Sequence, residues 1–206
     1  MIVDPAQTTR ADVYRLVIRC IVPRPIAWVS THDAGGIANL APFSFFTGVA
    51  SAPPSLLFCP GRRGEAGDKK DTLRNVEETG EFVVNLVTEE LAERMNETAT
   101  DYPPDVDEFA VAGLTPARSL LVGPPRVAES PVSFECRRLD VFQVGKGGAG
   151  GAAIVVGEIV MIHVDDRVLR DGKVDPERLR PVARLGGMEY TRLGERFTLV
   201  RKKYGA

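Results

Sequence analysis

Residue types that define several common protein classes are scarce in this chain of 206 residues. It contains two histidines and only three cysteines, which are Cys20, Cys59 and Cys136. An odd number of widely separated cysteines does not make a disulfide framework, so we expect reduced thiols and a cytoplasmic protein. Because the histidines and cysteines show no metal-ligand spacing, we also expect no metal site.

An excess of one charge and long apolar runs are absent too. The chain has 26 basic and 28 acidic residues, and its net charge is −2. Nucleic-acid-binding proteins usually carry a strong basic excess, so we expect no nucleic acid partner. No run approaches the ~18 apolar residues of a membrane-spanning helix. The N-terminal stretch MIVDPAQTTRADVYRL has early acids and no apolar core, so we expect neither a secretory signal nor a membrane anchor.

The composition is that of a folded domain with a substantial core. Hydrophobic residues make up 44% and charged residues 26% of the chain. No internal repeat or linker is visible, so we expect one domain over residues 1–206. Long strands are predicted over 132–144 and 153–164. Helices do not alternate regularly with the strands, which favours an antiparallel β-barrel with attached helices over a parallel sheet.

The most distinctive stretch is RPIAWVSTHDAGGIANLAPFSFF, residues Arg24–Phe46. An apolar run over Ile26–Thr31, a glycine turn and a second apolar run predict a β-hairpin. The hairpin gathers hydroxyls, the amide of Asn39, Ser44 and three phenylalanines. This set suits a planar, partly polar ring that carries a phosphate. An ordinary hairpin with its phenylalanines in the core explains the composition as well.

A second polar stretch, Arg62–Lys70, carries four cations directly before a predicted helix. We expect that helix to have Asp71 as its N-cap and Gly80 just past its end. Cations beside a helix N-terminus form a good anion site, although a solvated charged loop is equally compatible with these residues. The carboxylate of Asp71 would repel a phosphate unless it turns inward as a cap.

Other motifs are less informative. The pattern G-x-G-x-x-G at Gly145–Gly150 is followed by the strand-like run AAIVVGEIVMIHV, whereas a dinucleotide site requires a helix there, so we interpret residues 145–151 as a hairpin tip of open role. His163 lies among apolar residues of a strand. It is either a satisfied core histidine or a group that tunes proton delivery near a redox ring.

The order of several motifs gives the chain a family resemblance. The motifs are RPIAWVST with NLAPFSFF, KKDTLRNV, FVVNLV, GEIVMIHVDD and RLGGMEYTRL. Together they resemble the flavin reductase-like, FMN-binding split-barrel family, most closely its flavoredoxin-like branch, from about Ile18 to about Val200. The resemblance implies a Greek-key split β-barrel that is mainly β with attached helices. It also implies a homodimer with FMN near the subunit interface.

Each site residue implied by the resemblance matches a family motif. The expected flavin-binding residues are Trp28, Val29, Ser30, Thr31, Asn39, Ala41, Pro42, Ser44 and Phe45, with Lys70, Asp71 and Thr72 on the phosphate side, Arg62 as a helper, and Gly186 and Tyr190 from the C-terminal segment.

The resemblance implies an FMN-dependent oxidoreductase of the NAD(P)H:flavin reductase type, with FAD as an alternative to FMN. It would take hydride from NADH or NADPH and pass electrons to free flavin, a partner oxygenase or a redox protein. One alternative is an FMN-binding electron carrier without nicotinamide turnover. Another is a barrel that has lost its flavin and serves only in interactions.

Overall fold

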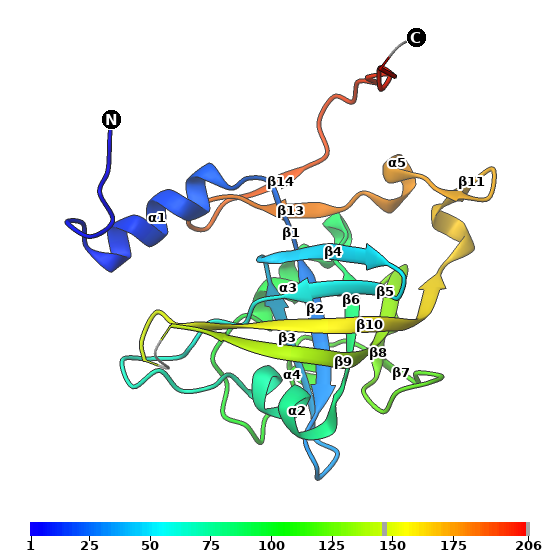
Figure 1. The fold of residues 1–206 in the computed structure, drawn as a ribbon. Coiled ribbons are helices and arrows are strands. Elements are labelled where there is room, and N and C mark those ends of the chain that lie inside the picture. Colours follow the sequence, from blue (N-terminus) through cyan, green and yellow to red (C-terminus); the bar gives the residue numbers. More distant parts are fainter. Residues whose placement is uncertain (146–147, 205–206) are drawn as a thin grey trace.

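One antiparallel sheet of seven strands forms the body of the molecule in this computed structural model, which describes residues 1–145 and 148–204 (Figure 1). The strand order across the sheet is β3-β2-β6-β9-β10-β5-β4. The bounds are β2 Ala27–His32, β3 Ala38–Phe43, β4 Phe46–Ser51, β5 Pro54–Phe58, β6 Glu81–Leu86, β9 Val132–Val144 and β10 Ala152–Val164.

The connection between β3 and β4 rolls this sheet into a barrel. These two strands lie at opposite edges of the sheet, yet only Ser44 and Phe45 separate them in sequence. Three residue steps from Phe43 to Phe46 span at most about 11 Å, so the two edges must come close together. The edges do not pair with each other. The result is a split β-barrel with helices attached, as the sequence predicts, and Ser44 and Phe45 lie at its seam.

Strand β2 is buried on both of its faces. Ala27 and Val29 point into the barrel and pack with Phe43, Phe58 and other core side chains. Trp28, which alternates with them, packs outside the barrel in a second apolar cluster. Because successive side chains of a strand point to opposite faces, the residues of β2 cannot all face one site.

Helices and 3₁₀ turns cover the barrel outside this sheet. Their bounds are α1 Arg10–Cys20, α2 Asp71–Thr79, η1 Glu89–Leu91, α3 Ala92–Glu97, α4 Glu108–Val111, η2 Asp166–Val168 and α5 Pro176–Leu179. Thr9 caps α1 with its side chain, and Gly80 ends α2 in the left-handed conformation at a φ of 73°. The predicted N-cap of α2 is wrong by one residue, because Lys70 is the cap and Asp71 is the first helical residue.

Three small sheets complete the fold. They are β1 Arg24–Pro25 with β13 Val182–Arg184 and β14 Tyr190–Arg192, β7 Pro116–Ala117 with β8 Arg126–Val127, and β11 Leu169–Arg170 with β12 Lys173–Val174. The chain beyond β14 runs away from the barrel without regular structure (Figure 1). In the predicted hairpin tip at 145–151, residues 146–147 lie outside the described residues. None of the helices described here is both long enough and apolar enough to cross a membrane.

Candidate functional site

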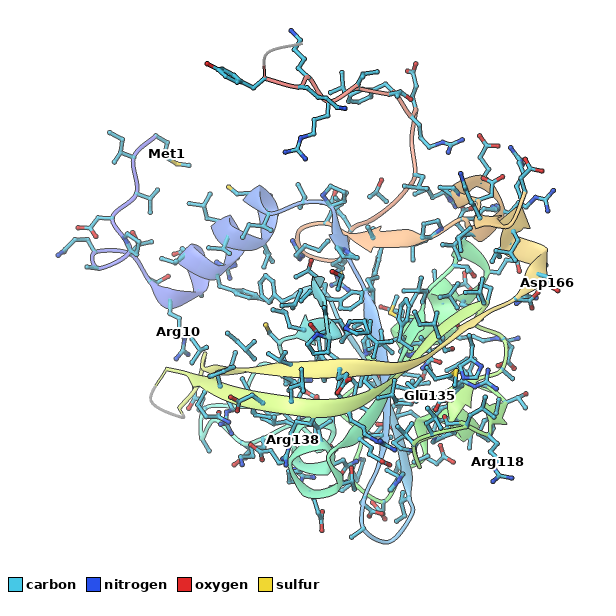
Figure 2. The ribbon with its side chains drawn as sticks, turned by 45° about the vertical axis from the view of Figure 1, so that its right-hand side comes forward. Met1, Arg10, Arg118, Glu135, Arg138 and Asp166 are labelled. Atoms are coloured by element: carbon cyan, nitrogen blue, oxygen red, sulfur yellow. The ribbon has the colours of Figure 1, made fainter. Side chains whose placement is uncertain are left out.

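A cavity of about 580 Å³ lies at the seam of the barrel. The two seam residues, Ser44 and Phe45, line it together with Arg62 and Lys70. Helix α1 contributes to the rim, and Arg10 of α1 donates a hydrogen bond to the carbonyl of Ala149 near the tip of the β9–β10 hairpin (Figure 2). The hairpin stretch Arg24–Phe46 and the cationic loop Arg62–Lys70, which are separate in sequence, therefore form walls of one cavity.

A smaller compartment of about 40 Å³ adjoins this cavity. Pro42 and Lys70 line both spaces. Asn39 and Thr72 line only the compartment, and the side-chain amide of Asn39 donates to Oγ1 of Thr72 at 3.0 Å. The combined space thus has an apolar part along Pro42 and the seam and a polar part at the start of α2.

Cations concentrate at this polar part. Lys70 lines the compartment and is the N-cap residue of α2, and the first N–H groups of a helix have no intrahelical partner. Arg63 also lines the compartment. Arg62 lines the larger cavity, and its buried Nε finds no hydrogen-bond partner among the described residues. Positive charge and free donors at one end make this space suitable for an anion.

Carboxyl groups lie beside these cations, and Asp101 balances part of their charge. Oδ1 of Asp101 lies 3.0 Å from Nε of Arg63 and 3.2 Å from Nζ of Lys70. Burial disfavours the ionised form of Asp101, but the two cations outweigh it and hold the pKa of this carboxyl below its usual value. Burial raises the pKa of Glu108, which accepts a hydrogen bond from the N–H of Leu40.

The buried side chain of Arg24 holds the seam in place through hydrogen bonds. Its guanidinium group is buried, with 4% of the residue exposed. It donates to the carbonyl oxygens of Ile18, Ile21 and Leu185 at 2.5, 2.6 and 2.7 Å. Its Nε lies 3.3 Å from Oγ of Ser44. One side chain therefore joins the end of α1, the turn before β14 and the wall of the cavity.

About half of the predicted cofactor-binding residues meet at this site. The cavity and its compartment are lined by Asn39, Ala41, Pro42, Ser44, Phe45, Arg62, Lys70 and Thr72. Asp71 lies beside the compartment but is buried, and it is held by Arg63 at 2.6 Å and by Arg74. Its carboxylate is thus paired with cations, which answers the concern that it would repel an anion.

The predicted residues of β2 do not reach the cavity with their side chains. Trp28, Val29, Ser30 and Thr31 are fully buried. Trp28 donates from Nε1 to Thr98, and Ser30 donates to the carbonyl of Pro125. Thr31 accepts from the side-chain amide of Asn75. These side chains already have partners within the chain, so in this structure they support the site from inside the fold.

Three other predicted residues also lie elsewhere. Gly186 packs against the side chain of Arg19. The ring of Tyr190 lies 4.5 Å from the guanidinium carbon of Arg184, and Tyr190 lines a different surface depression. His163 stands eleven residues along β10 from Ala152, roughly 35 Å in an extended strand. Its Nε2 lies 2.6 Å from Oε1 of Glu135, which fits a satisfied histidine, and a role of His163 in proton delivery stays a prediction.

Sequence reasoning missed several lining residues. Arg63 belongs to the cationic loop that the sequence singles out, but nothing in its sequence distinguishes it from Arg62. Tyr14 of α1 and Cys59 of the segment after β5 line the large cavity, and Glu108 lines the compartment. Only the barrel topology brings these segments together, so no local pattern could have identified them.

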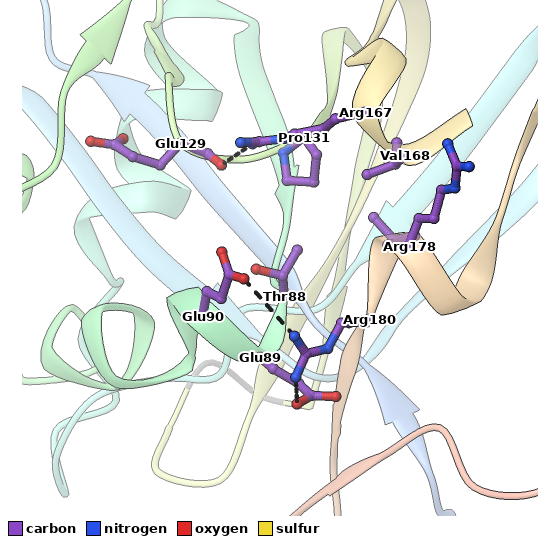
Figure 3. Close-up of a pocket in the computed structure, with 10 residues that line it drawn as sticks. Thr88, Glu89, Glu90, Glu129, Pro131, Arg167, Val168, Arg178 and Arg180 are labelled. Atoms are coloured by element: carbon purple, nitrogen blue, oxygen red, sulfur yellow. Dashed lines mark hydrogen bonds and ion pairs between the residues drawn. The ribbon is translucent and has the colours of Figure 1, made fainter. Parts of the chain in front are cut away.

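A second cavity of about 280 Å³ lies near α5, away from the seam (Figure 3). Its arginines already have partners, which are carboxylates or backbone carbonyls. Arg180 lies 2.7 Å from Oε2 of Glu89, and Arg167 donates to the carbonyl of Glu129 at 2.9 Å. We place the candidate site at the seam because the two stretches singled out in the sequence meet there, at Ser44 and Lys70.

The fold and this site define a class of split-barrel proteins with a half-apolar, half-cationic cavity at the barrel seam. Residues 18–179 match the family model described as "Flavin reductase like domain". The chain belongs to this family of flavin reductases.

Individual relatives agree with this assignment. An uncharacterized protein of Halalkalibacterium halodurans is 42% identical over 202 residues, which cover 98% of this chain and 96% of that protein. The crystal structure of nitrilotriacetate monooxygenase component B from Bacillus cereus is similar with a TM-score of 0.92 and 36% identity, and the match covers 97% of this chain and 98% of that one. Flavoredoxin of Desulfovibrio vulgaris (Miyazaki F) matches with a TM-score of 0.71, 26% identity and coverage of 86% and 90%. The structural neighbours thus include both a monooxygenase component and a flavoredoxin.

Proposed function

We propose that this protein is an FMN-dependent NAD(P)H:flavin reductase that binds FMN in the seam cavity. The observation that carries the proposal is that Ser44 and Lys70, from the two stretches singled out in the sequence, line one cavity of about 580 Å³. This volume lies within the usual range for small-molecule and cofactor sites, about 300–1,000 Å³.

The residues present fit a phosphorylated flavin. Lys70, Thr72 and the first N–H groups of α2 supply the charge and donors that a phosphate needs. The buried Nε of Arg62, which has no hydrogen-bond partner in the described part of the chain, offers a further donor. Phe45 and Pro42 supply the apolar cover that a ring face needs. When bound, FMN supplies the redox chemistry, and the protein binds it, orients it and limits its contact with water.

An absorption spectrum and a nicotinamide titration test this function. We expect purified protein to bind FMN and to oxidise NADH or NADPH in its presence under anaerobic conditions. Riboflavin should bind more weakly than FMN because it lacks the phosphate. Protein that neither binds FMN nor oxidises either nicotinamide would contradict the proposal.

Lys70→Ala tests the phosphate end directly. Loss of one charge-assisted hydrogen bond costs about 1.5–3 kcal/mol, so we expect the Kd for FMN to rise about tenfold or more. Lys69→Ala is the matched control, because Lys69 pairs with Glu77 and does not line the cavity. The Kd for riboflavin should change little in either variant. An unchanged Kd for FMN in Lys70→Ala would remove Lys70 from the site.

The similarity to a flavoredoxin supports a second candidate, an FMN-binding electron carrier without nicotinamide turnover. The two functions predict the same flavin spectrum but different kinetics. An electron carrier would remain oxidised in the presence of NADH and NADPH and would accept electrons from a reduced redox protein. A reductase would be reduced directly by one of the nicotinamides.

We also propose that the protein acts as a homodimer and delivers electrons to a partner oxygenase or to free flavin. Helix α1 contains no buried residue, although Tyr14 and Val17 lie on it. In the C-terminal segment Phe197 and Val200 are 84% and 89% exposed. Apolar surface of this kind commonly marks an interaction site, and a second copy would cover it. Light scattering should give twice the mass of the chain, and a monomer would contradict the dimer.

A further inference from the structure

The most unusual contact of the site is an acidic side chain on its phosphate-binding cations. One oxygen of Asp101 approaches both Lys70 and Arg63, at 3.2 and 3.0 Å. Asp101 directly follows Thr98–Thr100, which form a wall of the small compartment. An anion of the protein itself therefore contacts the two cations that an incoming phosphate would use.

Asp101 differs from Asp71 in the exposure of its side chain. The side chain of Asp71 is 8% exposed and is held by Arg63 and Arg74, so it belongs to the fixed frame of the site. The side chain of Asp101 is 64% exposed. Rotation into solvent would hydrate this carboxylate and cost it only its two ion pairs, and ion pairs of an exposed carboxylate contribute about 0.2–1 kcal/mol each.

We propose that Asp101 is an internal competitor for the phosphate of FMN, which must displace this carboxylate from Lys70 and Arg63 to bind. The inference rests on the proposed function and deepens it. Asp101 shortens the residence of FMN and favours an exchanging flavin over a permanently bound one. Since Asp101 contacts the cations that would hold the phosphate, its effect should be confined to ligands that carry the phosphate.

The test compares Asp101→Asn with wild-type protein in FMN and riboflavin titrations. Asp101→Asn removes the negative charge, so we expect the Kd for FMN to fall about three- to tenfold, as the loss of two exposed ion pairs predicts. The dissociation rate of FMN should fall by a similar factor. Riboflavin has no phosphate, and its Kd should not change.

Asp105→Asn is the matched control. Asp105 is exposed in the same segment and makes no ion pair with a described residue, so its substitution removes an equal charge without freeing Lys70. A weaker or unchanged affinity for FMN in Asp101→Asn would overturn the inference, since Asp101 would then position the cations or do nothing. Equal gains for FMN in both variants would also overturn it.

These outcomes separate the inference from the proposed function. If wild-type protein binds FMN and Asp101→Asn does not bind it more tightly, only the competition is wrong. If wild-type protein binds no FMN at all, the function and the competition are both wrong.

Discussion

Arg24→Met should destabilise the protein more than any exposed arginine substitution. The guanidinium of Arg24 donates to the carbonyls of Ile18, Ile21 and Leu185, and burial lowers the pKa of Arg24 from its ordinary value. Methionine keeps an apolar chain of similar shape but removes every donor. The carbonyls at the end of α1 and before β14 would lose their shared partner.

The magnitude follows from the number of acceptors and their burial. An acceptor left unsatisfied costs about 1–3 kcal/mol, and the three carbonyls share one donor group, so their costs do not add fully. The desolvation cost of the buried charge also disappears with the guanidinium. We therefore expect Arg24→Met to lower the free energy of unfolding by about 3 kcal/mol.

Urea unfolding at a fixed protein concentration measures this change, because the midpoint should fall while the slope stays constant. Arg15→Met is the control. Arg15 lies on α1, the helix whose end Arg24 holds, but its side chain is 69% exposed and, among the described residues, forms an ion pair with Asp12 alone. Its loss should cost under about 1 kcal/mol. Equal midpoints for the two variants would refute the anchoring role of Arg24.

Two further predictions concern the barrel wall. Burial disfavours the ionised form of Glu135, but hydrogen bonds from the N–H groups of Leu120 and Leu121 outweigh the effect of burial. The pKa of Glu135 therefore lies below its ordinary value. The stabilisation by this carboxylate is therefore full above pH ~4.3 and is lost as the pH falls through the folded-state pKa. Glu135→Gln should lower the free energy of unfolding by about 2–3 kcal/mol at pH 7 and make it less dependent on acid pH. Urea midpoints measured against pH would show both effects. Gly157→Ala places a methyl group 2.4 Å from the ring of buried Phe82 and should cost about 1–3 kcal/mol in the same assay, whereas Gly48→Ala has open space and should cost little. An unchanged urea midpoint for Glu135→Gln or for Gly157→Ala would contradict the role given to that residue.

Local sequence rules predicted most of the elements that depend on neighbouring residues. The strand over Val132–Val144 has the predicted bounds. The cap of α1 by Thr9 and the end of α2 at Gly80 follow from side-chain and glycine chemistry. Residues 196–200 form no strand, because no neighbouring strand pairs with their backbone.

The site was predicted less completely because it depends on the faces of strands and on long-range contacts. Ser44 and Lys70 were identified by their motifs. The burial of Trp28 and Ser30 away from the cavity depends on which elements cover the outer face of β2, and no local pattern specifies those elements. The role of Arg24 depends on carbonyls up to 161 residues away in the sequence.

The seam explains why an apolar surface and an anion site meet in this fold. The link of Ser44 and Phe45 is short enough to roll the sheet, but no hydrogen bonds join β3 to β4. A closed ladder would fill this gap with backbone, whereas the open seam leaves Phe45 and Pro42 facing the start of α2. The floor of the cavity is therefore built on strands, while its rim includes α1, a helix without buried residues. Since elements with few buried contacts open most easily, ligand entry should occur at the rim while the strands of the floor stay fixed.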